Sequence, residues 1–155
     1  MSFLGKVKKK LRNGSWYPFY NTFYEKNNLD PHMILLESRS GKALESNILS
    51  LLKELCQEPY RSFTLVLSVH RDSENEIKEK LQKNSIQGVR FVRTGSVAYY
   101  HALSRAGYLV NDTSFPGRFI KKEGQIYLNT WHGTPLKKMG RDNRPEMVTM
   151  GNVQR

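Results

Sequence analysis

Residues 33–41 read MILLESRSG, a run of four apolar side chains that is followed by a polar turn. A continuous apolar run of this length is typical of a parallel strand buried on both faces, because a solvated face would make every second residue polar. Ser38 to Gly41 are the small, polar and glycine residues that turn a chain. The stretch therefore predicts a buried strand followed by a tight loop.

Outward from this strand, apolar runs of strand length alternate with amphipathic runs of helix length. The nearest helical stripe comprises Ile48, Leu49, Leu51, Leu52, Leu55 and Cys56, and it is expected to stop near Glu58-Pro59. Further strands are predicted at 63–69, 89–92, 108–110 and 126–130. Further helices are predicted after an Asp72 or Ser73 cap and over 96–106, where Gly107 is expected to close the helix.

This alternation predicts the fold class α/β, with a doubly wound, mainly parallel, Rossmann-like sheet. Ligands of such sheets bind beyond the carboxyl ends of the strands. The candidate binding loops are therefore residues 37–42, 70–72, 93–96, 111–114 and 131–138.

The composition fits one compact domain and indicates an anionic partner. The chain has 155 residues, 38% of them hydrophobic, and a formal net charge of +11. Residues 1–24 and 115–155 each carry +5, whereas the middle carries +1. A single cysteine, Cys56, excludes an intramolecular disulfide and indicates a reducing, cytoplasmic compartment, and no metal-ligand spacing is present. No apolar run reaches the roughly 18 residues that span a bilayer, and no signal peptide is recognisable, so neither insertion nor export is expected.

The N-terminal segment, residues 1–29, has a basic amphipathic beginning. On a helical projection Phe3, Leu4, Val7 and Leu11 share one arc, and the bases outside or flanking it are Lys6, Lys8, Lys9, Lys10 and Arg12. Trp16 opens a run of aromatic residues that suits either lipid headgroups or a protein core. Two interpretations stay open: contact with an anionic membrane surface through these bases and Trp16, or a solvated helix whose aromatic residues pack on their own domain.

The loop after the last predicted strand combines several groups that suit phosphate chemistry. His132 has a pKa range that suits a general base or acid. Gly133 allows close approach to the backbone, and Thr134-Pro135 is typical of a helix start, whose exposed amides bind phosphate. Lys137 and Lys138 add positive charge one turn later. The alternative is a capped helix with a buried, hydrogen-bonded histidine.

A longer pattern resembles the CDP-glycerol glycerophosphotransferase family of teichoic acid polymerases and primases. The matching residues are Asn111–Pro116, Phe119, Lys121, Lys122, the run Gln125–Lys137, Gly140 and Asp142. Glu37-Ser38 with Gly41-Lys42 is similar to the family's first nucleotide-fold loop. The resemblance covers roughly residues 30–155.

The resemblance implies the N-terminal, acceptor-side domain of a two-domain, GT-B-like transferase of Gram-positive cell-wall biogenesis. His132 is then the base on an acceptor hydroxyl, which attacks the β-phosphate of the donor and expels CMP. The expected substrate- and phosphate-binding residues are Gly133, Thr134, Lys137, Lys138, Ser38, Gly41 and Asp112. Asp112 either orients the base or an acceptor hydroxyl, or caps its own turn. The second, nucleotide-binding domain is absent from these residues, so the fragment is expected to be inactive alone.

The implied substrates are CDP-glycerol or CDP-ribitol and a lipid-linked polyol-phosphate acceptor, with no cofactor and no metal. The protein is expected to be peripheral on the cytoplasmic face of the cell membrane. The alternative function is a non-catalytic module that binds an anionic polymer or nucleic acid. Nucleic acid is disfavoured because the basic C-terminal region is not interleaved with aromatic residues. Among the other histidines, His32 and His101 are expected to be structural, and His70 is a second candidate at the ligand edge.

Overall fold

A five-stranded parallel sheet forms the centre of the protein. The structure is a computed structural model, and it describes residues 16–116 and 119–131. The strands are β1 (Asp30–Glu37), β2 (Thr64–Val69), β3 (Arg90–Arg93), β4 (Ala106–Asn111) and β5 (Ile126–Asn129). Their order is β3-β2-β1-β4-β5, with every neighbouring pair parallel. The predicted doubly wound, Rossmann-like α/β sheet is confirmed.

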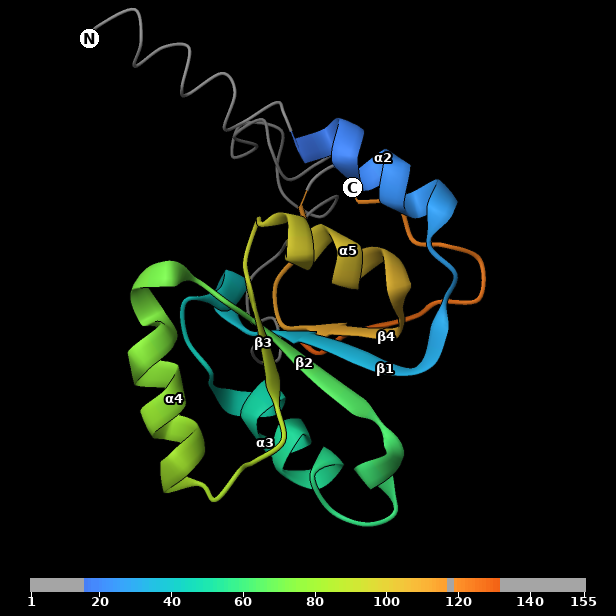
Figure 1. Cartoon of the computed structure of the whole chain (residues 1–155). Coiled ribbons are helices and arrows are strands. Elements are labelled where there is room, and N and C mark those ends of the chain that lie inside the picture. The colour runs from blue at the N-terminus through green and yellow to red at the C-terminus, as the bar shows by residue number, and fades with distance from the viewer. Residues whose placement is uncertain (1–15, 117–118, 132–155) are drawn as a thin grey trace, which may run out of the picture.

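Helices cover both faces of this sheet. They are α2 (Trp16–Lys26), α3 (Ser46–Leu55), α4 (Glu74–Lys83) and α5 (Val97–Arg105). Figure 1 shows α2 and α5 together on one side of the sheet and α3 and α4 on the other. This division follows from right-handed crossovers, because β1, β2 and β3 are added in one direction and β4 in the opposite direction.

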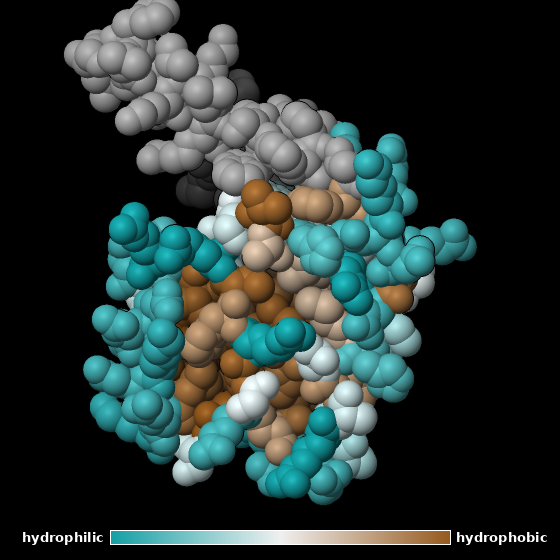
Figure 2. Space-filling view, in the orientation of Figure 1, coloured by the Kyte–Doolittle hydropathy of each residue, from teal (hydrophilic) through white to brown (hydrophobic). Residues whose placement is uncertain are grey.

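The alternation of side chains along β1 divides the core into two hydrophobic clusters. Ile34 and Leu36 pack with Ile48 of α3 and Ile77 of α4. Leu35 points the other way and packs with residues of α5. All three β1 side chains are at most 5% exposed. The strand is therefore buried on both faces, as its continuous apolar run predicts. In Figure 2 the apolar surface lies in the middle of the visible face, and the outer side of α4 is hydrophilic.

Gly107 does not close a helix, contrary to the prediction. The α5 helix ends at Arg105, and Ala106, with φ −59° and ψ 128°, turns the chain directly into β4. Gly107 lies inside that strand, where a Cβ atom would come within 2.8 Å of the Asp30 carbonyl oxygen. The glycine is therefore needed for the close approach of β4 to β1 rather than for a left-handed cap.

The aromatic part of the N-terminal segment packs on the sheet domain. Tyr20 is 3% exposed, and its hydroxyl donates a 2.7 Å hydrogen bond to the Ile120 carbonyl. Its ring lies 6.1 Å from that of Tyr100, and the Phe23 ring contacts His101 of α5 edge-on at 5.4 Å. For these aromatic residues the structure favours the packing interpretation. Lys6, Lys8, Lys9, Lys10 and Arg12 lie outside the described residues, and of Trp16 only its place at the start of α2 is described. Within the described residues, no helix is long and apolar enough to cross a membrane.

Candidate functional site

The strand order creates a switch point between β1 and β4. From β1 the chain continues through α3 on one face, whereas β4 is reached through α5 on the other. In such sheets the loops beyond the carboxyl ends separate at this point and leave room for a ligand. Glu37-Ser38 and Asn111-Asp112 end the two strands, so Ser38 and Asp112 lie at the predicted edge.

Ser38 and Asp112 are hydrogen-bonded to each other. The Ser38 hydroxyl donates to Asp112 Oδ2 at 2.8 Å, and the Arg39 amide donates to Asp112 Oδ1, also at 2.8 Å. Ser38 Oγ in turn accepts a 3.3 Å bond from the Glu45 amide just before α3. Both side chains are 1% exposed. Asp112 therefore joins the loops after β4 and β1, and its partners lie outside its own turn. We call these contacts the Ser38–Asp112 bridge.

Gly41 locks the loop after β1 against the ends of β2 and β3. It is buried with φ +78°, and Arg39 and Ser40 before it also have positive φ values. Its carbonyl accepts a 2.6 Å bond from the His70 amide. A Cβ atom at Gly41 would collide with Thr94 Oγ1 and lie 2.8 Å from the His70 nitrogen. This glycine lets three loops meet at one edge.

The end of β5 is fixed beside the start of α3. The Thr130 amide donates to the Asn111 carbonyl at 2.8 Å, and the Trp131 amide donates to Asn129 Oδ1 at 2.9 Å. Asn47 Nδ2, in the first turn of α3, donates to the Thr130 and Trp131 carbonyls at 3.4 and 3.3 Å. The chain therefore leaves the described region at the carboxyl edge of the sheet. His132, Gly133, Thr134, Lys137 and Lys138 follow directly and lie outside the described residues.

Exposed cations surround this edge. Lys42, Arg71 and Arg93 follow or end the first three strands, and none of them forms an ion pair with a described residue. Arg39 is paired with Glu45 at 3.8 Å. The described part of this edge thus presents positive charge, which favours anionic ligands.

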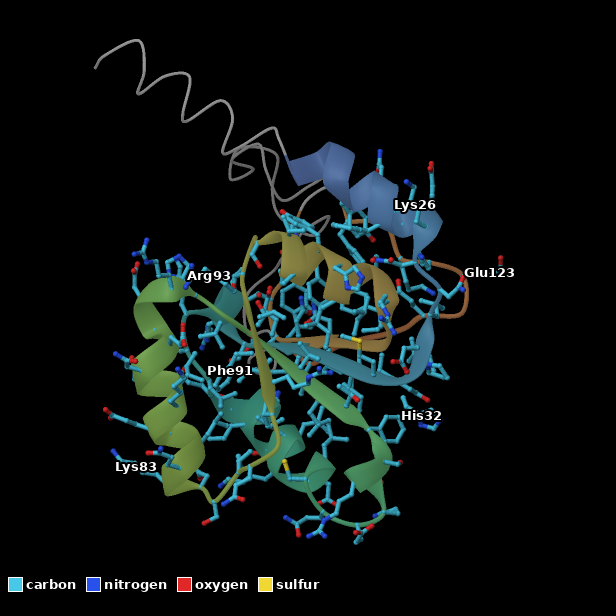
Figure 3. All side chains as sticks on the ribbon, viewed as in Figure 1. Lys26, His32, Lys83, Phe91, Arg93 and Glu123 are labelled. Carbon is cyan, nitrogen blue, oxygen red and sulfur yellow. The ribbon has the colours of Figure 1, made fainter. Side chains whose placement is uncertain are left out.

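The other histidines differ in their position relative to this edge. His70 directly follows β2, partly exposed, with Nδ1 3.5 Å from Asp72 Oδ2. The His32 ring lies 5.6 Å from that of Phe63, in the first half of β1. In Figure 3, His32 and Arg93 lie at opposite ends of the sheet. The ring contacts of His32 with Phe63 and of His101 with Phe23 fit the structural roles expected for these two histidines. His70 lies near the edge.

The sequence placed Glu37 in a candidate binding loop but did not indicate that its carboxyl group is buried. Glu37 is 1% exposed, and burial, with a smaller contribution from the Asp112 charge, raises its pKa. The hydroxyls of Ser68 and Tyr99 act in the opposite direction. The signal was present as an acidic residue at the end of an apolar run, where a buried strand would otherwise continue. Among the described residues, no group of three or more His, Cys, Asp or Glu side chains is placed to hold a metal ion.

Comparison with known proteins gives the family. The sequence profile of the CDP-Glycerol:Poly(glycerophosphate) glycerophosphotransferase family matches residues 19–155. The chain belongs to this family. A teichoic acid poly(glycerol phosphate) polymerase of Staphylococcus epidermidis is 31% identical over 123 residues, which are 79% of this chain and 16% of that protein. A teichoic acid glycerol-phosphate transferase of Staphylococcus aureus is 28% identical over 137 residues, 88% of this chain and 33% of that protein.

Solved structures of the wall teichoic acid polymerase TagF share the fold. One aligns with a TM-score of 0.67 and 24% identity over 99% of this chain and 37% of that chain. A histidine-to-asparagine variant of TagF soaked with CDPG aligns with a TM-score of 0.69 over the same shares. This chain thus spans a third or less of the two curated relatives described above and little more than a third of these structures.

Proposed function

We propose that this chain is the acceptor-side domain of a glycerophosphotransferase. The whole enzyme transfers glycerol phosphate, or ribitol phosphate, from a CDP-polyol to a hydroxyl of a lipid-linked, teichoic-acid-like acceptor. Family membership and the names of the relatives support this reaction class, and the TagF structure soaked with CDPG supports a CDP-polyol donor. The donor nucleotide is expected in a second domain, so the 155 residues alone are expected to release no CMP.

One observation carries the assignment of the reacting edge. Asn47 holds Trp131, the residue before His132, beside the first turn of α3 and next to the β1–β4 switch point. The described chain thus ends, one residue before His132, at the edge where ligands of doubly wound sheets bind. The exposed Lys42, Arg71 and Arg93 add an attraction for phosphate groups.

In the proposed reaction His132 removes the proton from an acceptor hydroxyl. The hydroxyl oxygen forms a bond to the β-phosphorus of the donor, and the bond from that phosphorus to the bridging oxygen breaks, which releases CMP. Gly133, Thr134, Lys137 and Lys138 are proposed to bind the phosphate groups through helix-start amides and positive charge. The Ser38–Asp112 bridge keeps the neighbouring loops in place. We also propose that the enzyme is peripheral and works on the cytoplasmic face of the cell membrane.

The test measures CMP release from CDP-glycerol by the full-length protein. Loss of a general base lowers the rate by about 100-fold to 10,000-fold, so His132→Ala should abolish measurable turnover while polymer binding remains. His70→Ala tests the second candidate, and His32→Ala, at the other end of the sheet, is the matched control. Turnover retained in His132→Ala would remove His132 as the base. Polymer binding without CMP release from the unmodified protein would favour the non-catalytic module instead.

A further inference from the structure

The residues that the loops after β1 and β4 expose are not the ones expected to bind substrate. Ser38 and Asp112 are each 1% exposed, and Gly41 is buried as well. Ser40 is exposed and Thr113 is partly exposed, and both lie in the loops at the β1–β4 switch point. A ligand at this point therefore meets Ser40 and Thr113 rather than the Ser38–Asp112 bridge.

The Ser40 and Thr113 hydroxyls form a pair across the switch point. Ser40 Oγ lies 3.5 Å from Thr113 Oγ1, although the two residues are 73 positions apart in the chain. This distance is long, because hydrogen bonds between hydroxyl groups normally measure about 2.7 Å. One ligand oxygen at about 2.7 Å from both hydroxyls can accept a hydrogen bond from each. An ionised phosphate oxygen suits this position, because it only accepts hydrogen bonds and carries negative charge.

The turn that carries Ser40 is held in a strained backbone conformation. Arg39 and Ser40 have φ values of +49° and +55°, in the left-handed region that favours glycine, and Gly41 follows with +78°. Such strain collects at functional sites, and it persists only where the surrounding contacts hold it. Here the Arg39 amide is bonded to Asp112, and the Gly41 carbonyl accepts from the His70 amide. These buried contacts therefore hold a strained turn that presents the Ser40 hydroxyl at the switch point.

Positive charge on the same turn is available to a ligand. The Arg39 side chain is 41% exposed, and its Nε lies 3.8 Å from Glu45 Oε2. An exposed ion pair of this length contributes little, so a phosphate group can replace Glu45 as the partner of the guanidinium. Lys42, which follows the turn, is also exposed. The nearby Asp112 carboxylate is buried, and both of its oxygens already accept hydrogen bonds. The exposed groups thus favour an anion with several oxygens.

We propose that the Ser40 and Thr113 hydroxyls and the Arg39 guanidinium form a binding site for a phosphate group of the polyol-phosphate acceptor. The two hydroxyls donate to one phosphate oxygen, and the guanidinium binds another. The bridge and Gly41 hold the turn without touching the substrate. The assignment to the acceptor rests on the proposed function, in which this domain is the acceptor side, whereas the binding of phosphate does not.

Ser40→Gly and Ser85→Gly are a matched pair of variants in the full-length protein. Both serines are exposed with φ +55°, and Ser85 precedes β3, at the other end of the sheet. Glycine adopts this conformation without strain, so neither change should lower the urea unfolding midpoint. Titration calorimetry measures the affinity for a synthetic poly(glycerol phosphate) oligomer. The affinity should fall at least about tenfold in Ser40→Gly, because a hydrogen bond to a charged group is lost, and should not change in Ser85→Gly.

The other two groups of the site are tested in the same titration. Thr113→Val removes the hydroxyl at nearly constant volume, and Arg39→Gln removes the charge, so each should weaken oligomer binding by a similar factor. Arg39→Lys should recover part of the loss, because it restores the charge but not the planar fork of donors. Arg61→Gln is the control, since Arg61 is an exposed arginine before β2, at the other end of the sheet.

Binding of CDP-glycerol identifies the source of the phosphate group. In Ser40→Gly and Thr113→Val the affinity for CDP-glycerol should stay unchanged, and the KM for the acceptor should rise with little change in kcat. Loss of CDP-glycerol affinity would overturn the assignment to the acceptor. Oligomer binding that is absent from the unmodified protein, or unchanged in Ser40→Gly, Thr113→Val and Arg39→Gln, would overturn the site itself. If the unmodified protein releases no CMP, the proposed function fails, while the titrations still decide whether the site binds phosphate.

Discussion

The Ser38 hydroxyl donates a 2.8 Å hydrogen bond to Asp112 Oδ2 at the point where β1 and β4 end side by side. The partners are 74 residues apart, so this bond closes a long loop of chain. It holds together two loops that the winding of the sheet would otherwise direct apart. Its consequences for stability are measurable without any assumption about the reaction.

Asp112→Ala should lower the free energy of unfolding by about 3 kcal/mol, because two short bonds to a buried carboxylate are lost and their donors stay buried. Asp112→Asn keeps one carbonyl acceptor and should cost less. Urea titration of each variant measures the effect. Asp72→Ala is the control, since the Asp72 side chain is 81% exposed and should change stability by no more than about 0.5 kcal/mol. Equal effects at positions 72 and 112 would contradict the role given to the bridge.

Gly41→Ala should be much more destabilising than Gly88→Ala, although the two glycines have nearly the same backbone conformation. Their φ values are +78° and +76°, so both variants bear the left-handed strain of about 1 kcal/mol. Only at position 41 does the added Cβ meet Thr94 and the His70 backbone. Overpacking of this kind costs about 1–3 kcal/mol more. The difference between the urea unfolding midpoints of the two variants measures the effect of this contact. Equal losses of stability would show that the three loops can move apart freely.

Gln125→Leu should destabilise the junction between α5 and β4. Gln125 is 3% exposed, and its Nε2 donates to the Leu103 carbonyl at 3.0 Å and to the Ala106 carbonyl at 2.7 Å. Its Oε1 accepts from the Lys122 amide at 2.9 Å. Loss of these bonds leaves three buried backbone groups unpaired, at a cost of about 3 kcal/mol. The midpoint of thermal unfolding should fall clearly for this variant. It should hardly change for Gln82→Leu, on the exposed side of α4.

Membrane contact is best tested by neutralising the basic residues of the N-terminal segment and not by removing the segment. Removing residues 1–24 would also remove Tyr20, which is buried in the domain and bonded to Ile120. Replacing Lys6, Lys8, Lys9, Lys10 and Arg12 by glutamine keeps the chain length. Sedimentation with anionic vesicles should fall by at least about tenfold, because each base near an anionic surface contributes about 1 kcal/mol. A control set removes the same charge at exposed positions elsewhere: Lys53, Arg61, Lys78, Lys83 and Arg90. Equal loss in both sets would mean that the overall charge, and not the N-terminal segment, attracts the vesicles.

The central strands and the helix α3 were predictable because each has an apolar pattern that fits only one kind of element. The runs at 33–36 and 63–69 correspond to β1 and β2, and the stripe from Ile48 to Cys56 corresponds to α3. A strand that is covered by helices on both faces needs a continuous run of apolar residues. A helix that is covered on one face needs apolar residues at helical spacing. The fold class therefore needed no knowledge of individual contacts.

Features that depend on distant partners were not predictable in the same way. Gly107 after a helix suits both a left-handed cap and a tightly packed strand, and only the approach of Asp30 decides between them. Asp112 was expected to act on a ligand or on its own turn, because nothing local indicates Ser38 as its partner. Glu37 and Asn111 become neighbours only through the register of β1 and β4. The roles of His132 and the residues after it stay predictions.

The packing of α2 has a consequence for synthesis on the ribosome. This helix is made before every other described element, yet Tyr20 is covered by Tyr100 of α5 and bonded to Ile120, one hundred residues later. The Tyr20 side chain therefore stays exposed while the first three strands are synthesised and pair. Nascent chains that stop before residue 120 should bind chaperones through this helix, since exposed apolar surface on incomplete domains is what chaperones recognise.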